Sequence, residues 1–529
     1  MTTPIKTDVI IVGAGPTGLS LACQLTRYGI DFVIVEKNPT VTAFSKALGV
    51  HARTLEIYEQ LDVARKAVEC GTVAGKVRML EGGEIVGEVD LSRIGQGLSP
   101  YPYMLVLEQS RNEELLYEYL QSRGHDVRWQ TVLESFSHDN SGVTVQVKDA
   151  SGASYVIEGK YLAGCDGASS SIRINLGLSF EGSTHARLFY VADVEIDWKF
   201  AHDALHGCLT RHSVLAFFPM PGERRWRIVG VFPDGHEHDD RKILFEEIEA
   251  RIKQEAEIDL DITEVYWFST YKVHTRHVEK FSLGRCFLAG DSAHIHTPAG
   301  GQGMNTGIQD AYNLAWKLAL VLKRSAPESL LDTYNEERLP NAKRLVETTD
   351  RMFNVVAGTD WFVNLIRTTV FPPMAKYILS IESVRRRFFL MISQIGITYR
   401  DSSLSLHRPA RSEGDREFDV KAGDRMPYFL VDGKSIYDRL RSPGFHLLTF
   451  SDGDLDYQTE RRELENKYGD LIDHHVIPLY PHVVELFDRD EPFNVLLRPD
   501  NYIAFITAET SLSSVDAYLS EVIKLAGGN

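Results

Sequence analysis

Cysteine is scarce in this chain, and the few cysteines are scattered. Only five occur among 529 residues, and no two of them form a C-x-x-C motif. An odd, dispersed set argues against a disulfide framework or a zinc ribbon and is typical of a reducing compartment. We therefore expect a cytoplasmic protein. The sequence after residue 290 contains no cysteine at all, which limits the chemistry available to that part of the chain.

Positive charge and long apolar runs are also in short supply. The 57 Lys and Arg residues stand against 74 Asp and Glu residues, a net charge of −17. Phosphate backbones and anionic lipids repel such a chain. The uncharged stretch 9–25 is interrupted by three glycines and is too short for a bilayer span, which needs about 18–20 apolar residues. We therefore predict neither nucleic-acid nor membrane binding.

What the sequence does contain begins with a glycine-rich turn. A β-branched apolar run leads into Gly13-Ala-Gly-Pro-Thr-Gly18, and a helical pattern follows. Gly13 permits a sharp turn, Gly15 lets the backbone approach a pyrophosphate, and Gly18 allows the helix to pack closely on the sheet. A second apolar strand ends at Glu36, which is placed to accept hydrogen bonds from a ribose. This context predicts a Rossmann-type dinucleotide site, without separating NAD from FAD.

Two further motifs follow predicted strands. Asp166 and Gly167 stand between an apolar strand and a helix that carries Arg173. In the simplest interpretation, Asp166 caps that helix. The other motif is Gly290-Asp291, followed by a glycine-rich loop at 298–305 and an amphipathic helix.

The order and spacing of the three motifs resemble those of the group A flavoprotein monooxygenases, the p-hydroxybenzoate hydroxylase and phenol hydroxylase family. The resemblance covers about the first 340 residues. It implies FAD as the dinucleotide, with Asp291 on the ribityl chain, loop 300–305 against the isoalloxazine and Pro298 beside the ring. It also implies that Asp166 and Arg173 support both FAD and the passage of the nicotinamide cofactor.

Two shorter segments share the resemblance. Gln109 matches a glutamine that contacts flavin in the family. Segment 44–56 matches one in which arginine often stands in place of Lys46, and lysine keeps the charge but loses the bidentate fork. The residues predicted to bind the cofactor are Gly13, Gly15, Pro16, Gly18, Glu36, Lys46, Arg53, Gln109, Asp166, Arg173, Asp291, Pro298, Gly301, Gly303, Met304 and Asn305.

The resemblance also predicts an α/β fold of four units. Alternating polar and apolar residues and a hairpin signal at 214–230 support an antiparallel sheet in the middle of the chain. The tail resembles the thioredoxin-like domain of phenol-hydroxylase-type members, and without cysteine it is expected to have a packing or dimer-stabilising role. The predicted units are 1–75 with 101–180 and 276–340 (FAD binding), 76–100 with 181–275 (substrate-binding sheet), 341–400 (helical bridge) and 405–529 (thioredoxin-like).

The implied activity is that of an FAD-dependent aromatic hydroxylase. It would consume NADH or NADPH and O2 and hydroxylate a phenolic substrate, polyketides and antibiotics included, through a C4a-hydroperoxyflavin. We expect a small aromatic molecule as partner, and the resemblance leaves room for a homodimer. Candidate residues of the substrate chamber are Phe217 and Tyr271 for binding, and Tyr271, His274 and Pro298 for catalysis.

Alternatives stay open at this point. The same scaffold serves flavin reductases, oxidases and halogenases, although Trp226-Arg-Ile228 does not form the W-x-W-x-I-P box of a halogenase. The chain could also be a flavin-binding scaffold that changes partners on reduction, which no motif favours. A metal site is not predicted, because His294 and His296 lack the helical i, i+4 spacing and an obvious third ligand.

Overall fold

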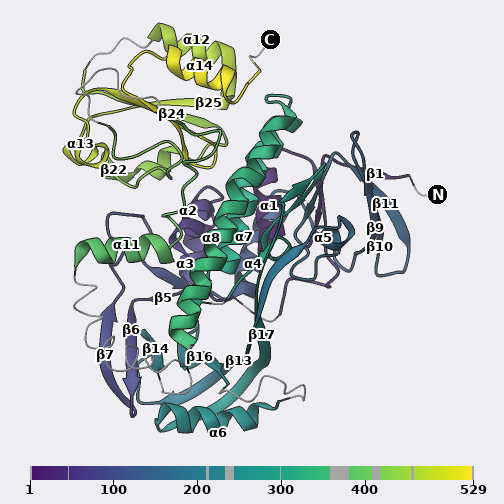
Figure 1. Ribbon diagram of the computed structural model, residues 1–529, viewed down its shortest axis with the longest axis vertical. Coiled ribbons are helices and arrows are strands. Elements are labelled where there is room, and N and C mark those ends of the chain that lie inside the picture. The colour runs from purple at the N-terminus through teal and green to yellow at the C-terminus, as the bar shows by residue number, and fades with distance from the viewer. Residues whose placement is uncertain are drawn as a thin grey trace.

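Three bodies of structure are stacked along the long axis of the molecule. In Figure 1 the C-terminal unit lies at the top, a helix-rich unit at the centre, and a large sheet covered by α6 at the bottom. The computed structural model describes residues 3–43, 45, 47–209, 214–232, 243–297, 299–357, 381–407, 417–453 and 458–526.

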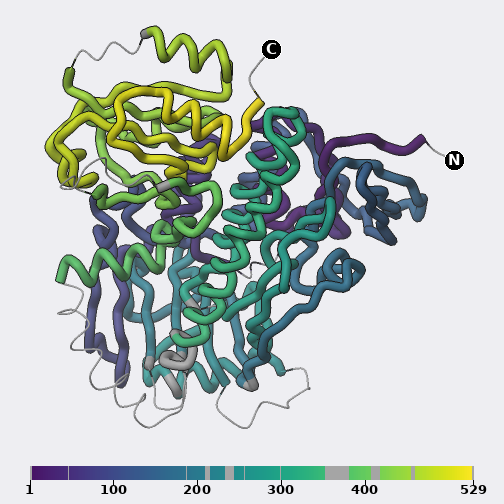
Figure 2. The backbone as a smooth tube through the Cα atoms, turned by 45° about the horizontal axis from the view of Figure 1, so that its top comes forward, coloured from purple at the N-terminus to yellow at the C-terminus, as the bar shows by residue number. Residues whose placement is uncertain are grey.

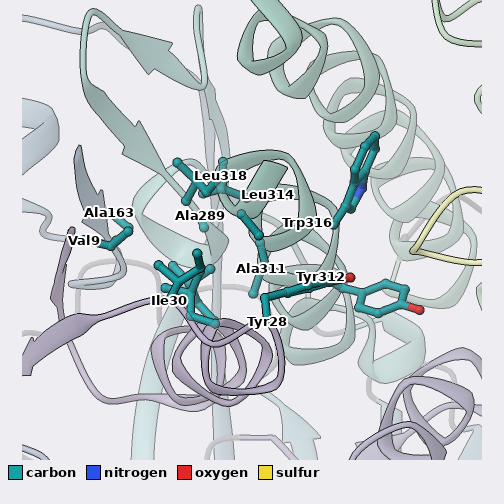
Figure 3. Packing of buried hydrophobic residues seen from close by; sticks show 14 of the residues in the cluster. Val9, Tyr28, Ile30, Ala163, Ala289, Ala311, Tyr312, Leu314, Trp316 and Leu318 are labelled. Atoms are coloured by element: carbon teal, nitrogen blue, oxygen red, sulfur yellow. The ribbon is translucent and has the colours of Figure 1, made fainter. Parts of the chain in front are cut away.

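The central unit is built on a five-stranded sheet with the order β18-β19-β12-β2-β3. Four strands are parallel, and β2 and β12 are buried along their whole length, as expected of strands covered by helices on both faces. Figure 3 shows the core beside them, where Ala311 and Leu314 of α7 pack near Ile30, while Trp316 points away. The strands and helices are β2 (Val9–Val12), β3 (Phe32–Val35), β12 (Tyr161–Gly164), β18 (Ser282–Leu283), β19 (Cys286–Leu288), α1 (Pro16–Arg27), α4 (Gln109–Ser122), α5 (Ser171–Asn175) and α7 (Gly303–Leu322).

Two small sheets and two short helices complete this unit. One sheet has the order β1-β11-β10-β9 and the other β4-β8-β5. The second matters for the site, because β4 is followed directly by α2. The elements are β1 (Ile5–Lys6), β9 (Val132–His138), β10 (Val143–Lys148), β11 (Ser154–Gly159), β4 (Gly49–Val50), β5 (Thr72–Ala74), β8 (Met104–Val106), α2 (Ala52–Glu59) and α3 (Ala64–Cys70).

The large sheet has eight strands in the order β20-β17-β13-β16-β15-β14-β6-β7. The predicted hairpin at 214–230 is confirmed, since β15 and β16 pair antiparallel with Pro219 opposite Trp226. The sheet is not wholly antiparallel, because β6 comes from an earlier part of the chain and pairs parallel with β14. Its elements are β6 (Lys76–Glu81), β7 (Glu84–Asp90), β13 (Phe180–Trp198), β14 (Ala204–Leu209), β15 (Val214–Pro219), β16 (Arg225–Val231), β17 (Leu260–Val278), β20 (His294–Ile295) and α6 (Phe245–Ala256).

The two faces of this sheet have different neighbours. The outer face packs its apolar side chains, among them Tyr190 and Ile228, against Ile248 and Ile252 of α6. The inner face meets the central unit, because Phe218 of β15 packs with Leu48 and residues of β8. The inner face, and not the face covered by α6, therefore borders the central unit.

Helix α8 (Asp332–Ala357) leads out of the central unit. It runs through Pro340, so the predicted boundary at residue 340 falls inside a helix rather than between two units. Helix α11 (Glu382–Ile392) follows, and the interruption predicted at Pro372-Pro373 lies outside the described residues.

The C-terminal unit is a five-stranded sheet with the order β21-β27-β26-β24-β25. Figure 2 shows it seated against the central unit, at the far end from the large sheet. None of the helices in the described part of the chain combines the length and apolar character that a membrane span needs. The elements of the unit are β21 (Leu406–His407), β22 (Leu430–Val431), β23 (Lys434–Ser435), β24 (Phe445–Phe450), β25 (Ile472–Ile477), β26 (Phe493–Leu497), β27 (Ile503–Thr507), α12 (Gln458–Tyr468), α13 (Pro481–Phe487) and α14 (Ser513–Glu521).

Candidate active site

The glycine turn after β2 has the geometry that its sequence predicts. Gly13 adopts φ +103°, and a Cβ at this position would lie 2.3 Å from the carbonyl oxygen of Cys165. A Cβ on Gly18 would lie 1.9 Å from the Gly13 oxygen. At Gly15, by contrast, nothing lies within 4 Å of the Cβ position. The outer two glycines therefore serve the packing of the turn, and the backbone at Gly15 is open to a ligand.

The groups around this turn suit an anionic ligand beside a sugar. Pro16 opens helix α1, whose N-terminus carries no side-chain cap. Its first N–H groups are thus available to an anion such as a pyrophosphate. Glu36 lies against the turn and accepts a hydrogen bond from the Ala14 N–H at 2.8 Å. Its carboxylate is therefore at the edge of the turn, where the sequence places the ribose.

Asp166 and Arg173 join two of the motifs. Asp166 Oδ2 accepts from the Ser171 N–H at 2.8 Å and so supports the start of α5 as predicted, although the N-cap residue itself is Ser170, whose side chain accepts from the Arg173 N–H. Its Oδ1 is buried and has no hydrogen-bond partner among the described residues. Arg173 donates to the Ser292 oxygen at 3.0 Å, beside Asp291, which is exposed on a 3-10 turn at Gly290–Ser292. This bond therefore links the two loops.

The glycine loop before α7 is fastened to β4 by Asn305. Its side-chain amide donates to the oxygens of Gly49 and Gly301, each at 2.9 Å, and its Oδ1 accepts from the His51 N–H at 2.9 Å. Gly301 adopts φ +62°, a conformation that favours glycine. Because its hydrogen-bonding groups are engaged within the protein, Asn305 positions the loop. The backbone from Gly301 to Met304 is what remains to meet a cofactor.

Gln109 also acts on a loop. Its Oε1 accepts from the Ala47 N–H at 3.2 Å, and its Nε2 donates to Glu113 at 2.9 Å. It therefore holds the segment that leads into β4. Lys46 and Pro298, the two other residues predicted near the flavin ring, lie outside the described residues.

Arg53 is the first predicted site residue that the structure places elsewhere. Its guanidinium donates to Glu56 at 3.1 Å and to the oxygen of Asp500 at 2.8 Å, and it is 1% exposed. These contacts direct Arg53 toward the C-terminal unit, so we withdraw it from the cofactor-binding residues. Asp500 is 447 positions away in the sequence, and no local pattern could have revealed this partner.

Phe217 and His274 are also misplaced by the sequence prediction. Phe217 is fully buried on the outer face of the large sheet, in the cluster that packs on α6, with its ring 4.8 Å from that of Trp198. His274 is exposed and bonds to Thr184 at 2.8 Å. Neither side chain lies on the inner face, because alternate residues of a strand point to opposite sides and the prediction took no account of which side faces inward.

Tyr271 does lie on the inner face. Its ring is 5.8 Å from that of Phe189, and both pack with Val231 and Val273. Burial raises the pKa of Tyr271 to about 12. The phenol is therefore a neutral hydrogen-bond donor at physiological pH.

A buried ion pair on the same face was missed by the sequence analysis. Asp193 and Arg227 form two hydrogen bonds, Nε to Oδ1 at 2.6 Å and Nη2 to Oδ2 at 2.7 Å. Arg227 lies opposite Asp193 on the neighbouring strand, and Trp267 lies opposite Asp193 on its other side. Asp193 is on the same face of the sheet as Phe189. Its Nη1 is buried without a partner among the described residues. An aspartate within an apolar strand was the available signal, but the pairing register was needed to use it.

Two histidines beside the glycine loop were not predicted as site residues, and one of them, His296, was considered only as a metal ligand. His51 Nε2 lies 3.0 Å from the Gly300 oxygen, and a Cβ on Gly303 would lie 3.3 Å from His296 Nε2. Burial lowers the pKa of each imidazole to about 4, so both are neutral. His51 Nδ1 and His296 Nε2 are buried without partners in the described part of the chain.

The arrangement as a whole fits a bound dinucleotide with a ring system at α7. The open backbone at Gly15, the uncapped α1 and the partnerless Oδ1 of Asp166 are groups that a ligand would satisfy, since buried polar atoms are otherwise paired. The N-terminus of α7 adds a positive dipole end for an anionic ring edge.

Known proteins agree with this assignment. Residues 6–349 match the family model described as FAD binding domain. A flavin-dependent monooxygenase of Mycobacteroides abscessus is 32% identical over 97% of this chain and 100% of that protein. The 6-methylpretetramide 4-monooxygenase of Streptomyces rimosus is 30% identical over 94% of this chain and 90% of its own.

The solved structures extend the agreement to the whole fold. The OxyS anhydrotetracycline hydroxylase from Streptomyces rimosus superposes with a TM-score of 0.77 at 29% identity, covering 99% of this chain and 100% of that one. The chain therefore belongs to the FAD-binding-domain family of flavin-dependent monooxygenases and is an FAD-dependent aromatic hydroxylase that uses NAD(P)H and O2.

Proposed function

We propose that this enzyme hydroxylates a phenolic ring of a polycyclic, polyketide-type substrate held between the large sheet and the glycine loop before α7. The observation that carries the proposal is the inner face of the sheet, which holds both the aromatic pair Phe189 and Tyr271 and the buried Arg227 with its partnerless Nη1. The relatives named for 6-methylpretetramide and anhydrotetracycline support a substrate of this size and class.

The cofactor would be held by backbone groups of the Gly13–Gly18 turn and the Gly301–Met304 loop, with Glu36 and Asp291 on its hydroxyl groups. When bound, FAD supplies electron transfer from NAD(P)H to O2 and delivery of one oxygen atom. Pro298 and Lys46 remain proposals for contacts near the ring. His51 and His296, being neutral, are proposed as hydrogen-bonding partners that add no charge.

Arg227 is proposed to orient the substrate and stabilise its charge. A guanidinium favours the ionised form of a nearby phenol, and a phenolate is a stronger carbon nucleophile. Asp193 accepts hydrogen bonds from Nε and Nη2 of Arg227 and so holds the guanidinium in one orientation. Nη1 is then left to donate to the substrate oxygen. Tyr271 is proposed to donate a hydrogen bond and, with Phe189, to exclude water from the reacting centre. Its raised pKa speaks against a role as general base.

Two coarser features complete the proposal. The aromatic partner is a small molecule, and a homodimer remains a proposal that sedimentation can test. A cytoplasmic location is proposed, because the five cysteines among the described residues are free.

The test combines a substrate panel with an Arg227 variant. The FAD-loaded enzyme is expected to oxidise NAD(P)H in response to a polycyclic phenol and to yield a product heavier by one oxygen atom. Because Arg227→Met alone would leave Asp193 charged and buried, the variant to use is Asp193→Asn with Arg227→Met. It should keep its flavin and lose about 10- to 150-fold in hydroxylation, the equivalent of one charged hydrogen bond.

A matched control is Arg224→Met, since Arg224 is exposed on the same hairpin. If the double variant hydroxylates at the rate of the unaltered enzyme, Arg227 does not act on the substrate. Anaerobic reduction of the substrate, without oxygen insertion, would remove the hydroxylase proposal itself.

A further inference from the structure

Three side chains with metal-binding atoms meet at the start of two neighbouring strands of the C-terminal unit. His446 lies on β24, and Asp473 and His475 lie on β25, which runs parallel to it with Asp473 opposite His446. Because alternate residues of a strand share a face, Asp473 and His475 point to the same side. One ligand atom from each of the three residues lies within 4.8 Å of the other two.

The distance between the two imidazoles is the one that a shared ion requires. His446 Nδ1 lies 3.4 Å from His475 Nε2 and 3.9 Å from Asp473 Oδ2. A direct N–H···N bond of this length would be a long one. Two nitrogens bound to one tetrahedral Zn²⁺, each at about 2.05 Å, would be about 3.3 Å apart.

The residues behind the cluster hold two ligands in orientation. The ring nitrogen Nε2 of His446 faces the carbonyl oxygen of Ser442 at 3.3 Å. A proton on Nε2 leaves the Nδ1 lone pair directed at the other two groups. The Ser442 hydroxyl donates to Asp473 Oδ2. Backbone and hydroxyl partners of this kind commonly fix metal-ligating histidines and carboxylates.

We propose that His446, Asp473 and His475 form a binding site for a divalent transition-metal ion, Zn²⁺ by its preference for imidazole and carboxylate ligands. His446 is fully buried, whereas the Asp473 side chain is 46% exposed, so the fourth position opens to water. The sequence predicted no metal, because these ligands come from two strands and have no helical spacing.

The site also adjoins a contact that holds the C-terminal unit. Ser442 follows Arg441, which pairs with Glu59 and Asp62 of the central unit and accepts a bond from Arg27 through its carbonyl oxygen. An ion that fixes Ser442 through its two contacts therefore fixes the loop that docks the unit. Binding would raise the thermal stability of the full chain, because only the folded state assembles the three ligands.

The experiment is a metal titration of the full-length, FAD-loaded enzyme after chelator treatment. Co²⁺ is added first and followed by its visible absorption in difference spectra, and Zn²⁺ is then added to displace it. One equivalent is expected to bind. His475→Ala and Asp473→Asn should each bind at least about tenfold more weakly, and Ser442→Ala about tenfold more weakly, as for loss of a supporting contact.

His482→Ala is the control, because His482 is an exposed histidine of the same unit. It should bind the ion as the unaltered chain does, and an unchanged urea unfolding curve without metal shows that the C-terminal unit of each variant is folded. If the unaltered chain takes up no ion, or if His475→Ala and Asp473→Asn take it up with unchanged affinity, the proposal is wrong.

Discussion

The glycine-rich cradle leaves backbone polar groups open, whereas the charged contact beneath the C-terminal unit pairs its charged groups with one another. In the cradle, formed by Gly13–Gly18 and Gly301–Met304, the Cβ position of Gly15 meets nothing and α1 is uncapped. In the contact, Lys317 pairs with Glu337 at 2.7 Å, and Arg498 pairs with Asp500 and with Glu337. The side chains of these four residues, which we call the interdomain cluster, are at most 1% exposed.

The difference separates a ligand site from a structural one. Each charge of the interdomain cluster is paired with an opposite charge inside the cluster, so no charge is left to bind a ligand. Partnerless buried atoms occur in several parts of the described chain, and two of them, Asp166 Oδ1 and Arg227 Nη1, lie by the cradle and on the inner face of the sheet. Buried polar atoms are costly unless paired, so these two are candidates for ligand contacts, because one lies beside the glycine turn and the other on the face that borders the central unit.

The largest expected effect is that of Gly13→Ala. The added Cβ would lie 2.3 Å from the Cys165 oxygen at a backbone φ of +103°, so the turn must move. We expect a loss of more than about 4 kcal/mol in unfolding free energy, together with loss of the yellow colour. Urea unfolding and the flavin-to-protein absorbance ratio measure both.

Gly15→Ala is the matched comparison, because a Cβ at position 15 would meet no protein atom within 4 Å. It should leave the flavin-free protein as stable as before and weaken FAD binding alone. Retention of FAD by Gly13→Ala would contradict the interpretation of the turn.

The next effect is expected at Glu337. Glu337→Gln removes the charge that compensates Arg498 and Lys317 in a buried cluster, which should lower the free energy of unfolding by about 3–5 kcal/mol. Glu347→Gln, at an exposed pair with Arg351, is the control and should cost about 0–1 kcal/mol. Equal losses of unfolding free energy for the two variants would show that the interdomain cluster does not stabilise the contact with the C-terminal unit.

Acid should weaken the same cluster. Burial alone would raise the pKa of Glu337, but the charges of Arg498 and Lys317 outweigh it and hold the pKa far below its ordinary 4.5. A depressed carboxyl pKa contributes stability above the unfolded value and loses it as the pH falls toward the folded value. The stability gap between the unaltered chain and Glu337→Gln should therefore shrink below about pH 4.5. Urea titrations from pH 7 to pH 3.5 test this, and a constant gap would refute it.

A smaller effect is expected for Asp291→Asn. Loss of a charged acceptor for cofactor hydroxyl groups should weaken FAD binding by about 1.5–3 kcal/mol, or about 10- to 150-fold. Flavin fluorescence during titration of the flavin-free protein measures the affinity. Asp490→Asn, at an exposed aspartate of the C-terminal unit, should leave it unchanged.

The smallest effect is expected for Tyr271→Phe. Loss of one neutral hydrogen bond should cost about 1 kcal/mol, or roughly fivefold in kcat/KM for hydroxylation. Because the pKa of Tyr271 is raised to about 12, the pH profile between 6 and 9 should keep its shape. A lost inflection in that profile would instead identify Tyr271 as a base.

The cofactor half of the site was largely visible in the sequence. Gly13, Gly15 and Gly18 act within one strand–turn–helix unit, so their roles follow from local backbone geometry. The support that Asp166 gives to the start of α5 is local for the same reason. Asn305 was found by its motif, but its role in fastening the loop to Gly49 and His51 depends on contacts across about 250 positions.

The substrate half and the metal cluster were not visible in this way. Phe217 and Phe218 are adjacent, and only the orientation of β15 decides that one packs on α6 and the other faces the central unit. Arg227 and Asp193 meet through strand pairing, as do His446 and His475. Pairing register is set by the whole sheet, so single residue types carry little information about it.

By itself, the sequence determined a dinucleotide site, because a glycine turn and the acid beside it act over a few residues, and its resemblance to a known family implied FAD and the class of the reaction. The tertiary structure alone decided which side chains face the substrate, that Arg53 serves the C-terminal contact, and that two histidines and an aspartate converge. The physical reason is that these outcomes depend on which face of a strand is covered and by what, a property of packing between segments hundreds of residues apart.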